Sequence, residues 1–178
     1  MTINLKDLEI GYPGISKNIG AYLMEATIFC LEMNNHESSI VVSIEGKEDI
    51  ELIWETPLTN QIKRSWRDTK ETVEYGAVGL SLLLIHHFTE FVILERSYQG
   101  TGFDYWLGNT NFDENIPSIV QRKARLEISG ILKESSKNKF SVRIKQKIKQ
   151  VEKYDWEYPV YIVIVEFSFP KAKIINHE

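Results

Sequence analysis

The chain has 178 residues, of which 43% are hydrophobic and 26% are charged, as is usual for one soluble globular domain with a core. Its single cysteine, Cys30, excludes an internal disulfide framework and an all-cysteine zinc site, and the net charge of −4 argues against tight, sequence-independent binding to a polyanion. The longest apolar run, Gly76 to Ile85, is far shorter than the roughly 20 residues that span a bilayer. The first residues also lack the layout of a secretion signal, so we expect a cytoplasmic protein that does not associate with membranes.

Residues 1–58 predict a helix followed by a β-hairpin. Apolar residues recur at helical spacing between Ile15 and Met33. Two alternating segments, 39–44 and 49–54, are typical of strands, and Glu45-Gly46-Lys47 between them is a hairpin signal. We expect this unit to be an addition to the main body of the chain.

The rest of the chain predicts a helix, three strands, a second helix and a further strand. The expected helices are 60–88, in one or two pieces, and 142–153; the expected strands are 91–94, 102–107, 124–132 and 160–167. The last strand is continuously apolar, which is typical of a strand covered on both faces. Residues 170–178 follow it and are predicted to be a loose tail. The order predicts one α/β (α+β) domain, 1–178, with a mixed central sheet flanked by helices.

Positive charge is concentrated in residues 122–153. This segment holds eleven of the 21 basic residues and only three acidic ones, so the remainder of the chain is acidic. A charged helix face is often simply solvated. The asymmetry nevertheless makes this segment the predicted contact for nucleic acid.

Two acidic residues lie in otherwise alternating apolar sequence. Asp104 belongs to GTGFDYWLG and Glu127 to ARLEISGI, in consecutive predicted strands. Two carboxylates on neighbouring strands form a simple site for a hard divalent cation such as Mg²⁺. The structural alternatives are that Asp104 bonds the backbone of a turn and that Glu127 pairs with Arg125.

The order helix–strand–strand–strand–helix–strand, with an acid in the first helix, an aspartate in the second strand and a glutamate in the third, resembles the PD-(D/E)XK nuclease superfamily. Restriction endonucleases and many DNA-repair nucleases belong to it. The resemblance covers residues 60–169 and implies a restriction-endonuclease-like core to which the N-terminal helix and hairpin are added. It also implies an Mg²⁺-dependent enzyme that cleaves phosphodiester bonds in nucleic acid, with bacterial defence as one setting.

The resemblance assigns roles to individual residues. Asp104 would be the second-strand acid, Glu127 the third-strand acid and Glu74 the acid of the first helix. Asp104, Glu127 and the backbone carbonyl of Ile128 would bind Mg²⁺, which orients a water and stabilises charge on the phosphate. Strand alternation independently places Glu127 and Ser129 on one face of their strand and Ile128 on the other.

Ser129 departs from the family pattern, which has a lysine at this position that helps to activate the attacking water. In some relatives the lysine lies in the following helix, which makes Lys145 and Lys149 candidates here, with Lys123 a weaker one. The alternative is a catalytically inactive nuclease-like fold that serves as a nucleic-acid-binding or protein-interaction subunit. The serine and the acidic net charge support that alternative.

Overall fold

The computed structural model describes residues 1–153 and 157–177. An eight-stranded mixed sheet organises the chain, in the order β1-β3-β2-β8-β7-β6-β5-β4. The strands are β1 (Thr2–Asn4), β2 (Ile40–Ile44), β3 (Ile50–Ile53), β4 (Phe91–Arg96), β5 (Tyr105–Asn109), β6 (Ala124–Ile131), β7 (Val160–Glu166) and β8 (Lys171–His177). The helices are the 3₁₀ helix η1 (Leu5–Ile10) and the α-helices α1 (Lys17–Glu32), α2 (Asn60–Ser65), α3 (Thr69–Phe88), α4 (Ser118–Gln121) and α5 (Phe140–Val151).

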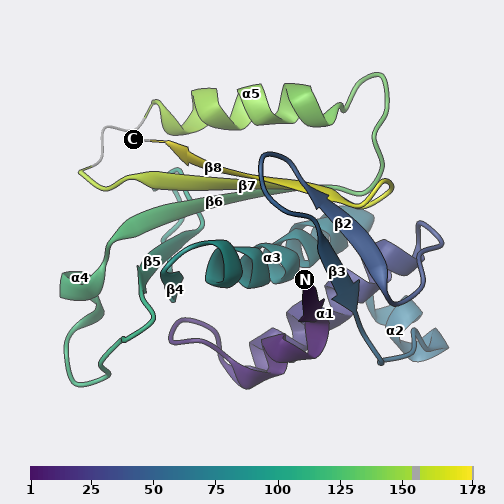
Figure 1. Ribbon diagram of the computed structural model, residues 1–178, viewed down its shortest axis with the longest axis horizontal. Helices are drawn as coiled ribbons and strands as arrows, with labels where there is room; N and C mark the ends of the chain where they lie inside the picture. The colour runs from purple at the N-terminus through teal and green to yellow at the C-terminus, as the bar shows by residue number, and fades with distance from the viewer. Residues whose placement is uncertain (154–156, 178) are drawn as a thin grey trace.

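The sheet separates two helical layers, with α5 on one face and α1 and α3 on the other (Figure 1). Period-two alternation in the central strands produces this arrangement. In β6, Leu126 and Ile128 join the large core with α1 and α3, whereas Ile131 packs with α5. In β7, Val163 and Ile164 divide in the same way between the two cores. The continuous apolar run of β7 therefore reflects burial on both faces, as predicted.

Small residues allow α1 and α3 to approach each other closely. A Cβ on Gly79 would lie 2.4 Å from Thr27 Oγ1 and 2.8 Å from the Leu23 carbonyl oxygen. Gly76, one turn earlier in α3, instead meets Ala26 and Cys30 of α1. The later residue of α3 thus contacts earlier residues of α1, so the helices are antiparallel. The start of α1 consequently lies toward the end of α3.

The predicted order of elements is confirmed from residue 15 to residue 166, with local differences. The 60–88 segment forms the two helices α2 and α3, and the hairpin forms as antiparallel β2 and β3. The second strand of the main body begins at Tyr105 instead of residue 102, because the chain bends through Gly100 and Gly102, whose φ values are +93° and +84°. The short elements β1, η1 and α4 are additions that the sequence patterns did not predict.

The prediction of a loose tail over residues 170–178 is wrong for 171–177, which form β8. This strand pairs antiparallel with β7 along seven residues and parallel with β2, so it joins the main sheet to the hairpin. Ion pairs of Lys171 with Glu134 and of Lys173 with Glu45 anchor its polar positions. Its partner β2 is distant in sequence, whereas β7 directly precedes it across the turn 167–170. The sequence of β8 itself has alternating lysines and is only weakly apolar. Among the described residues, no helix combines the length and apolarity that a membrane crossing requires.

Ala172 tests the structural role of β8, because this residue is fully buried. Ala172→Asp would place an uncompensated carboxylate in the core and should lower the free energy of unfolding by about 2–4 kcal/mol. Asn176→Asp adds the same charge at an exposed position of the same strand and should change stability little. Urea unfolding of both variants measures the difference. Equal stabilities would contradict the assignment of β8 to the core sheet.

Candidate functional site

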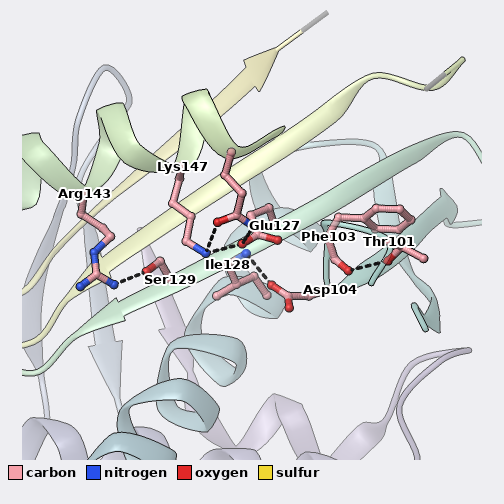
Figure 2. Close-up of polar contacts among 9 residues, drawn as sticks. Thr101, Phe103, Asp104, Glu127, Ile128, Ser129, Arg143 and Lys147 are labelled. Atoms are coloured by element: carbon pink, nitrogen blue, oxygen red, sulfur yellow. Dashed lines mark hydrogen bonds and ion pairs between the residues drawn. The ribbon is translucent and has the colours of Figure 1, made fainter. Parts of the chain in front are cut away.

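The candidate site lies where β5 leaves β6. The strands pair at Tyr105↔Leu126, and continuation of that register would set Phe103 against Ile128. Instead the Phe103 carbonyl accepts from Thr101 Oγ1 at 3.2 Å, within the turn that carries the chain away (Figure 2). The Ile128 N–H donates to Asp104 Oδ2 at 2.8 Å. The carboxylate of Asp104 therefore takes the place of a missing backbone partner and is fixed by that bond.

Asp104 stands beside Glu127 in this register, one residue before the first β5–β6 pair. Asp104 is half-buried and Glu127 is buried, with a side chain only 5% exposed. Burial raises the pKa of Asp104, while the Ile128 N–H and Lys147 counteract the shift and Glu74 adds to it. The pKa of Glu127 is raised to about 7, first by burial and then by the neighbouring Asp104 carboxylate, against the opposing effects of Lys147 and Gln150.

A lysine from α5 provides the countercharge. Lys147 Nζ forms an ion pair with Glu127 Oε1 (Figure 2). It also donates to Gln150 Oε1 at 3.1 Å. Gln150 Nε2 donates to the same Glu127 oxygen at 3.0 Å. Lys147 and Gln150 are three residues apart and lie on the same face of the helix. This face meets the polar side of β6, on which Glu127 and Ser129 lie as predicted.

These residues border a cavity of about 670 Å³. Its lining comes from α3, the end of β4, the start of β5, the second half of β6, the segment that follows β6, and α5. The charged side chains that line it are Lys70, Glu74, Arg96, Asp104, Arg143 and Lys147. Four of these six side chains are basic, although the whole chain carries a net charge of −4. The cavity is therefore suited to an anionic ligand beside the two acids.

The structure brings most of the predicted site residues together. Asp104, Ile128 and the exposed Glu74 all line the cavity, and Glu127 is bonded to a lining residue. The lysine at Glu127, however, is Lys147 and not the predicted Lys145.

All three candidate lysines lie on exposed positions and not at Glu127. Lys145 and Lys149 are exposed on α5, and Lys123 is exposed before β6. The positions of Ile144 and Ile148, which pack on the sheet, could have indicated Lys147, because it lies three residues after one and directly before the other.

Comparisons of the chain with protein-family models, with curated proteins and with solved structures find no match.

The oxygen atoms at the point where β5 leaves β6 fit a hard divalent cation. Within a strand, the N–H and C=O of one residue point to the same side, so the Ile128 carbonyl points toward Asp104, where β5 no longer pairs. Two carboxylates and a carbonyl are oxygen ligands of the type that Mg²⁺ prefers. In the described part of the chain, no three His, Cys, Asp or Glu side chains form a metal-binding group. Waters or substrate oxygens would therefore supply the remaining ligands, as is common for Mg²⁺.

The coupling between these groups predicts opposite pKa changes in two variants. Asp104→Asn removes a neighbouring negative charge and should lower the pKa of Glu127. Lys147→Met removes the ion-pair partner and should raise it. Carbon-detected NMR titration of the Glu127 carboxyl measures both shifts, and Lys145→Met, exposed on the same helix, is the control. A Glu127 pKa that moves equally in the Lys145 and Lys147 variants would contradict the contact.

The raised pKa of Glu127 also predicts how stability depends on pH. A glutamate of the unfolded chain titrates near 4.5, whereas Glu127 in the folded protein titrates near 7. The folded state therefore binds more protons between these values, so the contribution is fully present below pH 4.5 and is lost as the pH rises through 7. Relative to Glu127→Gln, the wild type should lose unfolding free energy between pH 5 and pH 8. A constant difference across this range, measured by urea unfolding, would refute the shift.

Proposed function

We propose that this protein is an Mg²⁺-dependent phosphodiesterase of nuclease type that acts on nucleic acid. The observation that supports it best is the cluster of Asp104, Glu127 and Lys147 beside a predominantly basic cavity. With the short helix α4 set aside, which lies between β5 and β6, the order α3-β4-β5-β6-α5-β7 agrees with the pattern on which the resemblance to the PD-(D/E)XK superfamily depends. We accordingly propose a restriction-endonuclease-like core over residues 60–169.

The acids and one carbonyl would hold the cation. One carboxylate oxygen of Asp104 accepts a hydrogen bond from the Ile128 N–H, which fixes the carboxylate at the point where β5 leaves β6. Glu127 and the Ile128 carbonyl complete the proposed protein ligands. When bound, Mg²⁺ would neutralise phosphate charge and lower the pKa of a bound water.

Lys147 would replace the lysine that the family has at position 129. Its ammonium group reaches Glu127 from α5, and Lys147 lines the cavity, so it lies close to where a phosphate bound to the cation at the two acids would sit. There it can donate to a phosphate oxygen and stabilise the charge that develops during attack by water. Glu74 lines the same cavity from α3 and raises the pKa of Asp104, so it can influence the protonation of the metal-binding acid.

Metal binding and cleavage provide the first test. The wild type should bind Mg²⁺ or Mn²⁺ in isothermal titration and cleave a labelled oligonucleotide, whereas Asp104→Asn and Glu127→Gln should lose both. At a pH well above the Glu127 pKa, where Glu127 is ionised in both proteins, Lys147→Met should keep metal binding and lower kcat by about 10²–10⁴-fold, because it removes a positioned group that acts in the transition state.

The matched control is Lys17→Met. Lys17 is exposed at the start of α1, near the end of α3 that is remote from the cavity-lining residues of that helix. This variant should retain wild-type kcat. Such sites can complete their coordination only with substrate, so the titration is repeated with an oligonucleotide present. An absence of metal binding and of cleavage under both conditions would refute the enzymatic proposal.

The second candidate function is a non-catalytic nucleic-acid-binding subunit. It is supported by the exposure of Lys145 and Lys149, one turn apart on the outer side of α5. Such a subunit would bind oligonucleotides with an affinity that falls with salt and with the replacement of these two lysines. The affinity would survive Asp104→Asn and Glu127→Gln.

A further inference from the structure

Arg143 is a second cation of the cavity, but its chemical setting differs from that of Lys147. It lies in the first turn of α5 and lines the cavity. One terminal nitrogen donates to Ser129 Oγ at 2.8 Å, and the other donates to Asn138 Oδ1 at 2.9 Å (Figure 2 shows the first bond). Both acceptors are neutral. Across residues 1–153 and 157–177, no carboxylate forms an ion pair with this guanidinium.

The guanidinium is therefore oriented without being neutralised. An arginine side chain has five N–H groups in a rigid plane, and two of them are used by Ser129 and Asn138. The other three have no acceptor within the described part of the chain. A half-buried cation with fixed orientation and unused donors is suited to a planar or tetrahedral oxyanion, which it can bind through two parallel hydrogen bonds.

The position of Arg143 relates it to the acids. Arg143 and Lys147 are four residues apart, so they follow one another along one face of α5. Their partners on β6, Ser129 and Glu127, are two residues apart and share a face of that strand. The unneutralised guanidinium thus lies one step along the strand from the proposed metal ligands, in the same cavity. This step separates the two sites enough for each to contact a different anionic group of one ligand.

We propose that Arg143, oriented by Ser129 and Asn138, forms an anion subsite that binds a phosphate group of the substrate next to the phosphate that the cation at Asp104 and Glu127 would hold. The inference deepens the proposed function and rests on it for the identity of the substrate. Occupancy of the subsite by phosphate alone requires no metal. The hydroxyl of Ser129 serves as a positioning group, and the guanidinium makes the contact.

Titration of inorganic phosphate in the presence of EDTA tests the subsite directly. The side-chain Nε–H signal of Arg143 in the wild type should shift and saturate as phosphate is added, with no divalent cation present. Arg143→Gln should weaken phosphate binding by at least about tenfold, because a hydrogen bond to a charged group is lost. Arg143→Lys, which keeps the charge but loses the planar fork, should weaken it less. Lys17→Gln, which removes a remote exposed charge, should leave the affinity unchanged.

The outcomes separate the subsite from the proposed enzyme. A shift of the Arg143 signal in a protein that neither binds Mg²⁺ nor cleaves would support the subsite and refute the nuclease. Metal binding and cleavage without such a shift, and with the same KM in Arg143→Gln as in the wild type, would overturn the subsite alone. The wild-type signal decides the question even if Arg143→Gln fails to fold. Phosphate shifts at the Lys17 end of the molecule but not at Arg143 would also overturn it.

Discussion

The hydrogen bond from the Ile128 N–H to Asp104 determines the geometry on which the site depends. Backbone donors of a strand must be paired, and β6 loses its neighbour where β5 bends away. The Asp104 carboxylate replaces that neighbour, so the sheet can open without leaving the donor unpaired. The same bond positions Asp104 where β5 separates from β6. It leaves the Ile128 carbonyl available to a ligand. A structural requirement of the sheet therefore produces the arrangement of oxygen atoms that we propose binds a metal.

The polar face of β6 follows from the amphipathic character of α5. The helix packs on the sheet through Ile144, Ile148 and other apolar residues. Because Lys147 and Arg143 lie beside these apolar positions, they are carried between helix and strand and not into solvent. Each meets a polar residue of β6, and the pKa of Glu127 remains raised despite the ion pair. The protein thus retains a carboxylate that ionises at a cost, and carboxylates of this kind cluster at functional sites.

Local pattern was enough to predict much of the fold and part of the site. Alternation in β6 correctly assigned Glu127 and Ser129 to one face, because that rule depends only on the strand itself. The lysine was misassigned because α5 offers a basic residue at every second position from 143 to 149. Because Ile144 and Ile148 pack on the sheet, Arg143 and Lys147 contact β6. Lys145 and Lys149 are exposed. The strand β8 was missed because its own sequence has little apolar alternation and its pairing with β2 is long-range, although its pairing with β7 is a local hairpin.

The serine at position 129 is best understood together with Arg143. A lysine there would point to the same face as Glu127 and would bring its ammonium group toward the guanidinium of Arg143, where like charges repel. A cation extending from the strand and a guanidinium bound to that strand position are therefore alternative ways of placing positive charge in this space. With serine, the strand supplies an acceptor and the helix supplies both cations, Lys147 at the acids and Arg143 beside them. A serine at position 129 is thus compatible with a positively charged cavity, because α5 provides the charge from the opposite side.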